Sequence, residues 1–374
     1  MPRGASVMGA GPRNEVAIGS SQLAEILRVA KRTHGGASAP VKGWAKWLLF
    51  KAGVYRWTAP PAREPRAFVI TYHKVEHRPA GPFGMLALDV PAFNAHVEFL
   101  ARAYEVVPLS VLTAGLKTGN LPSRAVSLTF DDGYRNNLVL AWPVLRHHRV
   151  PATVFVTAGL VGTRRWMWTS ELLEMALRYG MTAVGVASGD SLLSALLQAE
   201  IPPSMRAEAA VEYLVRLGPA AREQIMERLR LCFPVEPDDE NRFLSWEEVR
   251  ALKAGGVEIG SHTMTHPVLP DLDREQVRTE LEASRDEIAE RIGERPRLFC
   301  YPHGLFSPTV KEITRRFYDA AVSTIPGENT PTTDPLELRR VAAYTVDDLA
   351  FQLARPRLRH RDAGGAPSAA PARG

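Results

Sequence analysis

The chain has few of the features that mark disulfide-stabilised, membrane-spanning or exported proteins. Only two of its 374 residues are cysteines, Cys232 and Cys300, too few for a disulfide framework and without the paired spacing of a thiolate metal site. It contains no run of about eighteen apolar residues, which argues against a spanning helix. Residues 1–20 lack the apolar core of a secretory signal. We therefore expect a cytoplasmic protein.

The body of the chain has no excess of positive charge. The net charge is +5, but residues 1–66 carry +8 and residues 355–374 carry +4, which leaves −7 for residues 67–354. A nucleic-acid-binding domain would carry its positive charge on the folded face itself. The sequence therefore predicts no nucleic-acid partner, whereas its basic ends favour acidic surfaces such as phospholipid headgroups.

One basic segment, residues 41–57, interleaves Lys and Arg with three tryptophans. Trp44, Trp47, Leu48 and Tyr55 would share one face of a helix. Such helices lie in anionic membrane interfaces, so this segment predicts peripheral contact at the inner face of a membrane. The alternative is a helix that packs across the folded domain, because aromatic stripes usually face a core.

The composition divides the chain into three parts. Residues 1–65 are expected to form a basic extension that is partly helical, over 22–32, and partly disordered, ending in a proline-rich linker. Residues 66–354 should form the folded domain. Residues 355–374 are Arg, Pro, Ala and Gly, and are expected to be disordered.

Short β-type runs alternate with helical patterns through the predicted domain, which is typical of an α/β fold with parallel strands. A helical block over about 160–245 interrupts this alternation, and we interpret it as an insertion with one long helix from Met205 to Cys232. The alternation is compatible with a barrel or an open sheet, and both place ligands at the carboxyl ends of the strands. The predicted strands are 67–72, 105–108, 125–130, 152–157, 257–260, 297–301 and 320–323, with Arg340 beginning a last one.

Polar clusters follow three of these strands. Asp131 and Asp132 end the run that begins at Ser127, and His262 and His266 follow the run that begins at Val257. A Pro/Gly turn with His303 follows the third. Each motif alone is more often a turn or a solvated loop. Together, however, an Asp and two His form a natural ligand set for a divalent metal.

These residues predict a metal-assisted hydrolysis of an amide or ester. Asp132, His262 and His266 would hold the ion, and Asp131, beside them but not a ligand, would act as general base. A backbone N–H near His303 would donate to the oxyanion. The histidines lie in a loop and lack the Glu of an HExxH helix, so this is not the HExxH arrangement of zinc proteases.

The segments Thr129-Phe-Asp-Asp-Gly133 and Ser261-His-Thr-Met-Thr-His266 resemble the first two motifs of the polysaccharide deacetylases, the NodB-homology or carbohydrate esterase family. Thr71-Tyr-His-Lys-Val75 is similar to the first strand of one branch, and the resemblance extends over about residues 67–345. It implies a distorted (β/α)7 barrel of the glycoside hydrolase/deacetylase type, a zinc-type ion and removal of an N-acetyl or O-acetyl group from a sugar. It also implies Asp131 as base and Asp132, His262 and His266 as ligands.

The chain departs from the family pattern in its third motif. The Arg that usually orients the base is replaced by Cys300, and the Tyr after the Pro is replaced by His303. We expect Arg340 to supply the missing cation. His303 and His73 are candidates for the general acid, although each is equally consistent with a structural histidine.

The remaining expectations concern the substrate and the ion. Tyr301, Pro302 and Gly304 are expected to bind substrate, and Trp166 and Trp168 are available to stack on sugar rings. The ligand set admits Zn²⁺, Co²⁺, Ni²⁺ or Mn²⁺, with Zn²⁺ favoured. The substrate would be an acetylated glycan or a lipid-linked glycan precursor. The alternatives are an amidohydrolase acting on a non-sugar C–N bond and a catalytically impaired barrel that binds metal or glycan.

Overall fold

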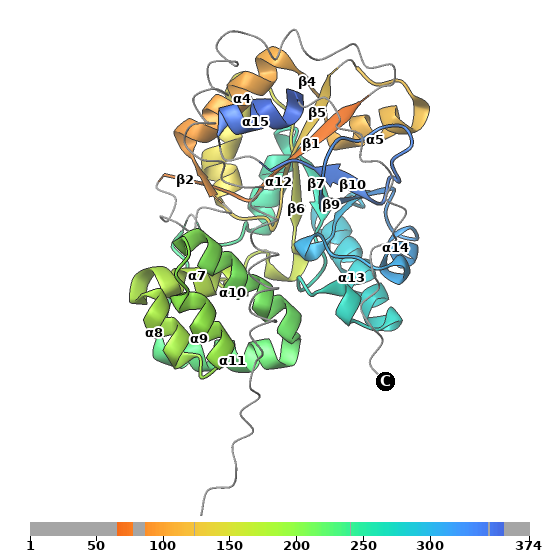
Figure 1. The fold of residues 1–374 in the computed structure, drawn as a ribbon. Helices are drawn as coiled ribbons and strands as arrows, with labels where there is room; N and C mark the ends of the chain where they lie inside the picture. Colours follow the sequence, from red (N-terminus) through yellow and green to blue (C-terminus); the bar gives the residue numbers. More distant parts are fainter. Residues whose placement is uncertain (1–65, 78–86, 123, 240, 343–344, 355–374) are drawn as a thin grey trace, which may run out of the picture. The chain divides into compact units, whose positions relative to one another are not determined.

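The computed structural model describes residues 66–77, 87–122, 124–239, 241–342 and 345–354 (Figure 1). Within this part the chain divides into two compact units, a helical one formed by residues 175–233 and one that contains the other described residues. The predicted helix over 22–32, the basic segment 41–57 and the tail from 355 lie outside the described residues. No helix in the described part is both long and apolar enough to cross a membrane.

The larger unit is built on parallel strands. In the described part of the chain, seven of them follow one another around the sheet, and β4 (Glu105–Val106) pairs with β5 off this path. The backbone N–H of Thr71 donates to Val341 O at 3.0 Å, and that of Val341 donates to Val69 O at 2.8 Å. These bonds join the first strand to the last, so the sheet is nearly closed and the predicted (β/α)7 barrel is confirmed. In order, the strands are β1 (Ala67–Tyr72), β5 (Ala125–Phe130), β6 (Thr153–Val156), β7 (Glu258–Ser261), β8 (Leu298–Cys300), β9 (Ala320–Pro326) and β10 (Leu338–Arg340).

Helices connect the strands and surround them in Figure 1. Their ends follow sequence signals: Ser245 and Glu248 form a capping box, and so do Asp273 and Gln276. Gly293, with φ of 73°, ends the helix that Asp273 begins. The elements are α4 (Val90–Ala103), α5 (Leu109–Thr118), η2 (Asn137–Ala141), α6 (Trp142–His148), η3 (Ala158–Leu160), α12 (Trp246–Ala254), η4 (Leu269–Asp271), α13 (Arg274–Ile292), η5 (Pro302–Gly304), α14 (Pro308–Thr314) and α15 (Val346–Ala354).

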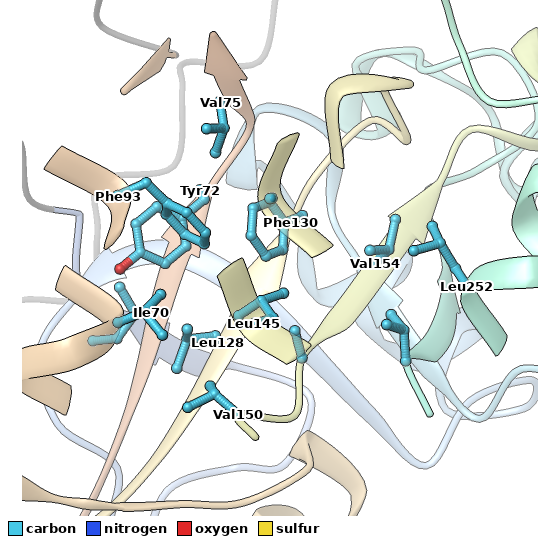
Figure 2. Close-up of a cluster of buried hydrophobic side chains, with 14 of the residues drawn as sticks. Ile70, Tyr72, Val75, Phe93, Leu128, Phe130, Leu145, Val150, Val154 and Leu252 are labelled. Atoms are coloured by element: carbon cyan, nitrogen blue, oxygen red, sulfur yellow. The ribbon is translucent and has the colours of Figure 1, made fainter. Parts of the chain in front are cut away.

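Apolar side chains fix the strands from both faces. Figure 2 shows Ile70, Leu128 and Phe130 among the residues that pack between the sheet and the outer helices. On the other face, Phe155 packs with small residues from several strands, and a Cβ on Gly260 would lie 2.4 Å from its ring. Gly260 therefore leaves room for the Phe155 ring. The close packing of these side chains fixes the positions of the strand ends that carry the polar residues.

The helical unit contains α8 (Met181–Ala187), α9 (Ser191–Gln198), α10 (Pro203–Leu217) and α11 (Pro219–Cys232), while α7 (Trp168–Tyr179) spans its boundary. The prediction of one long helix from Met205 to Cys232 is wrong. Gly218 has a φ of 87° and Pro219 has no N–H to donate. These two residues divide the segment into α10 and α11.

The compact helical unit is narrower than the predicted block of about 160–245. Gly162 N–H donates to Leu244 O at 2.7 Å, and Arg135 N–H donates to Arg242 O at 2.8 Å. The first bond joins the two ends of the block to each other, and the second joins its C-terminal end to the segment after β5; both ends belong to the larger unit. A small parallel pair, β2 (Lys74–Glu76) and β3 (Ala87–Asp89), was not predicted.

Candidate active site at the carboxyl ends of the strands

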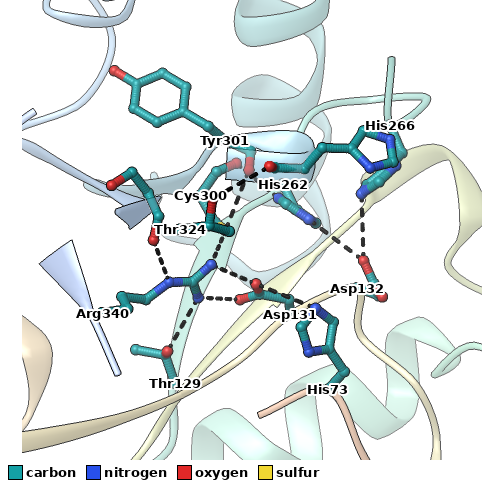
Figure 3. A network of polar contacts seen from close by, with 12 residues as sticks. His73, Thr129, Asp131, Asp132, His262, His266, Cys300, Tyr301, Thr324 and Arg340 are labelled. Atoms are coloured by element: carbon teal, nitrogen blue, oxygen red, sulfur yellow. Dashed lines mark hydrogen bonds and ion pairs between the residues drawn. The ribbon is translucent and has the colours of Figure 1, made fainter. Parts of the chain in front are cut away.

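Five of the predicted site residues come from three different strand ends. Asp131 and Asp132 follow β5, His262 follows β7, and Arg340 is the last residue of β10 rather than the first, as the sequence suggested. Figure 3 shows their side chains facing one another with His266. The structure thus brings together the five residues to which the sequence assigned base, cation and ligand roles.

One half of the site, which we call the arginine side, consists of Asp131, Arg340, Thr129 and Cys300. The guanidinium of Arg340 donates through Nη1 and Nη2 to the two oxygens of Asp131, both at 2.7 Å. It also donates to Ser323 O at 2.8 Å and to Thr129 Oγ1 at 3.3 Å, and Nη2 lies 3.4 Å from Cys300 Sγ. This is a buried, bidentate ion pair with its remaining donors satisfied.

The ion pair decides the charge of Asp131. Burial alone would raise the pKa of this carboxyl, but Arg340 outweighs burial and holds the pKa below its ordinary value. Burial would likewise lower the pKa of Arg340, and the charge of Asp131 raises it. His73 Nε2 lies 3.8 Å from Asp131 Oδ2, beyond hydrogen-bond distance. Asp131 is therefore an ionised carboxylate whose orientation is set by Arg340.

The other half, which we call the histidine side, consists of Asp132, His262 and His266. Asp132 Oδ1 lies 3.4 Å from His262 Nε2 and 3.5 Å from His266 Nε2. His262 Nδ1 lies 2.7 Å from the carbonyl oxygen of Cys300. Because a carbonyl only accepts, Nδ1 carries a proton, and Nε2 is the nitrogen that faces Asp132.

The histidine side fits a divalent ion. One ligand atom from each of its three residues lies within 4.8 Å of the others. Ligand atoms held about 2.1 Å from a common ion are separated by about 3.0–3.4 Å, close to the two distances from Asp132 Oδ1. A second group, Asp131 with His262 and Cys300, is equally compact, but Arg340 already binds both oxygens of Asp131. Of the two groups, the histidine side is therefore the one with ligand atoms left to hold an ion.

The protonation of the histidine side follows from its burial and its charges. Burial would raise the pKa of Asp132, but the hydrogen bond from His262 and the nearby histidines lower it. Burial lowers the pKa of His266, and His262 and His303 lower it further. Asp132 is thus ionised and His266 neutral, the states in which both bind metal.

The turns that present these residues are conformationally strained. Among the described residues, six that are not glycine have positive φ, and four of them are at the site. These four are Asp132 at 73°, Thr263 at 67°, His266 at 61° and His303 at 56°. Such conformations cost about 1–3 kcal/mol each and cluster at functional sites.

Of the residues predicted to act in or next to the turn η5, His303 is the one whose side chain contacts the histidine side. The ring centroid of His303 lies 4.8 Å from that of His266 and 6.1 Å from that of Trp168. Gly304, with φ of 68°, has no room for a Cβ, which would lie 2.0 Å from Thr324 Oγ1. Pro302 is buried in the same turn.

Tyr301 is not brought to the site. Its side chain is buried in a core cluster, where it stacks on Phe306 with ring centroids 4.8 Å apart. Figure 3 shows its ring directed away from Asp131 and Arg340. The reason is strand alternation: Tyr301 and Cys300 point to opposite faces, and Cys300 takes the site-facing position.

The sequence interpretation missed two contributors, the hydroxyl of Thr129 and the carbonyl of Cys300, and it assigned no role to Lys74. Thr129 is a polar residue in a strand buried along its whole length, a signal that could have been used. Lys74 is buried with its ammonium 4.3 Å from the centroid of the Tyr134 ring and 3.9 Å from Glu76 Oε1. Its burial lowers its pKa. No sequence signal indicates the Cys300 carbonyl, because any residue supplies one.

The fold and the paired carboxylates at the strand ends define a class of barrel hydrolases, and comparison with known proteins gives the family. The model of the polysaccharide deacetylase family matches residues 118–199 and 206–318, more than half of the chain. The protein therefore belongs to the polysaccharide deacetylase family. YxkH of Bacillus subtilis, a protein that bears the family's name, is 28% identical over 121 residues. That match spans 32% of this chain and only 40% of the length of YxkH.

Solved structures share the fold at low sequence identity. The deacetylase PplD of Streptococcus pyogenes, solved in complex with acetate, superposes with a TM-score of 0.53 at 17% identity, over 78% of this chain and all of that one. IcaB of Ammonifex degensii gives a TM-score of 0.52 at 20% identity, over 78% of this chain and 99% of that one. At these identities, both likenesses show a shared fold.

Proposed function

We propose that the protein is a metal-dependent deacetylase that removes an N-acetyl or O-acetyl group from a glycan. One observation carries this proposal: an ionised carboxylate fixed by a buried arginine lies directly beside an Asp and two His that fit a divalent ion. The first arrangement suits a general base and the second a metal. The membership of the polysaccharide deacetylase family supports an acetylated sugar as the substrate.

In this proposal, Asp132, His262 and His266 hold the ion, with Zn²⁺ favoured and Co²⁺, Ni²⁺ or Mn²⁺ as alternatives. A bound ion of this kind supplies Lewis acidity, which polarises a carbonyl and lowers the pKa of water. The carbonyl of Cys300 fixes the tautomer of His262, so that Nε2 is the nitrogen available as ligand.

Asp131 accepts the proton of the water that attacks the acetyl carbonyl, and Arg340 keeps Asp131 ionised and oriented for that transfer. The leaving group needs a proton in return. His303, whose ring lies against that of His266, and His73, 3.8 Å from Asp131, are the two candidates. A backbone N–H of the η5 turn is the candidate oxyanion donor.

Two tryptophans, Trp166 and Trp168, support a sugar as the substrate. Trp168 lies against His303 and Trp166 lies near Lys74, at 5.7 Å from its ammonium. Aromatic rings of this kind stack on sugar rings, which favours a glycan or a lipid-linked glycan precursor over a small non-sugar amide.

Acetate release tests the proposal. Acetylated chito-oligosaccharides and O-acetylated oligosaccharides are incubated with protein that has been treated with chelator and then supplied with Zn²⁺ or Co²⁺. We expect release only after metal is restored. Release from a non-sugar amide and from no sugar would favour an amidohydrolase. No release from metal-loaded protein with any substrate would favour an impaired barrel that binds metal or glycan.

Membrane contact and a cytoplasmic location stay predictions from the sequence, since residues 41–57 lie outside the described part. Deleting residues 1–60 should reduce binding to anionic liposomes and leave acetate release unchanged. Equal binding of the full-length and shortened proteins would contradict a membrane role for this segment.

A further inference from the structure

The loop that carries both histidine ligands needs support from outside itself. It runs from His262 to His266, and Thr263 and His266 within it have φ values of 67° and 61°. Left-handed backbone is unfavourable for residues other than glycine, most of all for a β-branched Thr. Inside the loop, Thr263 Oγ1 accepts from His266 N–H at 3.0 Å and donates to the carbonyl of His262. These local bonds close the turn but do not anchor it to the barrel.

Glu280, on α13, provides such an anchor. Its Oε2 accepts from the backbone N–H groups of Met264 and Thr265, both at 2.9 Å. Its Oε1 accepts from the Thr265 hydroxyl at 2.6 Å. Met264 and Thr265 lie between the two ligands, so one carboxylate holds the middle of the loop through three charge-assisted hydrogen bonds.

The use of Glu280 differs from that of its neighbours on the same helix. Glu275 and Glu282 pair with Arg278, and Glu287 pairs with Arg291. Among the described residues, Glu280 has no such ion pair. Its hydrogen bonds go to the loop of residues 262–266 instead, whereas these neighbouring glutamates form ion pairs within α13.

A second anchor comes from the segment after β6. Ala158 N–H donates to Thr263 O at 3.0 Å, and Gly159 N–H donates to Met264 O at 2.9 Å. One residue earlier, Thr157 N–H lies 3.3 Å from Asp132 O. This segment therefore contacts both turns that carry ligands. Gly159 has no room for a side chain, because a Cβ would lie 2.6 Å from Met264 O.

We propose that Glu280 and Gly159 are positioning residues that set the metal affinity of the histidine side. This inference rests on the proposed metal site. Glu280 holds the loop from α13 and Gly159 holds it from the segment after β6, so that His262 and His266 face Asp132 before any ion arrives. Loss of either anchor lets the strained loop relax to conformations in which the two Nε2 atoms no longer converge.

Metal titration of the full-length protein tests this. The chelated protein is titrated calorimetrically with Zn²⁺ or Co²⁺, and the Glu280→Ala, Glu280→Gln and Gly159→Ala variants are compared with it. We expect Glu280→Ala and Gly159→Ala to weaken binding by about 10- to 100-fold, as when other supports of metal ligands are lost. Glu280→Gln should stay within a few-fold of the wild type, because its amide oxygen still accepts from both backbone N–H groups.

Glu290→Ala is the matched control, an exposed glutamate on the same helix, and should leave the metal affinity unchanged. Thermal unfolding in chelator separates positioning from folding. Weaker binding by folded Glu280→Ala, with recovery in Glu280→Gln, supports the proposal. A Glu280→Ala variant that binds as tightly as the wild type, whether or not its unfolding temperature falls, overturns it. A wild-type protein that binds no metal would instead refute the metal site itself.

Discussion

The arginine side and the histidine side differ although their carboxylates are consecutive in the chain. Asp131 is paired with a cation that the protein itself provides, and both of its oxygens are engaged. Asp132 faces two imidazole nitrogens, and these three residues together fit a divalent ion. The positive φ of Asp132 turns the backbone between the two side chains. A single turn thus gives two identical residues different partners and hence different chemistry.

The largest effect that would test this comparison is on turnover. Asp131→Asn should lower acetate release by about 10²- to 10⁴-fold, the usual contribution of a general base, while the metal dissociation constant changes only a few-fold. Initial rates and calorimetric titration measure the two quantities. Activity retained by this variant would show that Asp131 is not the base.

The converse change on the histidine side is His266→Ala. We expect it to remove tight metal binding, and with it the rise in unfolding temperature that Zn²⁺ should give the wild type through preferential binding to the folded state. His147→Ala, a change on α6 outside the site, is the control. An undiminished thermal shift in His266→Ala would exclude this residue as a ligand.

Stability distinguishes the two sides as well. Arg340→Met leaves the buried carboxylate of Asp131 without its cation, a change that typically costs about 3–5 kcal/mol. The double variant Asp131→Asn/Arg340→Met should recover part of that loss, because no unpaired charge remains. Denaturant unfolding of chelated protein gives both values. A double variant less stable than the sum of the single changes predicts would contradict a compensated pair.

A smaller effect concerns His96, a buried histidine outside both sides, whose Nδ1 lies 3.4 Å from Tyr72 Oη. Burial lowers the pKa of His96 to about 4, below the ordinary value of about 6.5. As the pH falls, the unfolded chain therefore takes up this proton first, and stability decreases between about pH 6.5 and pH 4. The loss is at most about 3 kcal/mol.

His96→Leu should flatten this part of the stability profile, measured by denaturant unfolding at several pH values in chelator. An unchanged slope in the variant would assign the acid sensitivity to other groups, the site histidines among them.

The regular part of the fold was predictable because its signals are local. The strands over 67–72 and 125–130 agree with β1 and β5 residue for residue, and the capping boxes at Ser245 and Asp273 are local signals that begin helices. The single helix over 205–232 was wrong because Gly218-Pro219 divides the segment into two helices. The β2 and β3 pair joins two three-residue strands separated along the chain, which no local pattern specifies.

The site was predictable where its residues end strands and unpredictable where they depend on three-dimensional contact. The sequence motifs singled out Asp131, Asp132, His262 and His266, and the structure brings them together. Arg340 was predicted as the substitute cation because it was expected to begin the last strand, but its bidentate contact with Asp131 depends on closure of the barrel. Glu280 carries no local signal among the charges of α13, since its partners lie in a loop that precedes the helix.

The contact between Arg340 and Asp131 also has a consequence for synthesis. The two residues are 209 positions apart, and Arg340 is the last residue of the last barrel strand. A nascent chain that has been made as far as β9 already contains both carboxylates and both histidines, but Asp131 has no guanidinium beside it. The ion pair that fixes Asp131 therefore cannot form until β10 has been made and has joined the sheet.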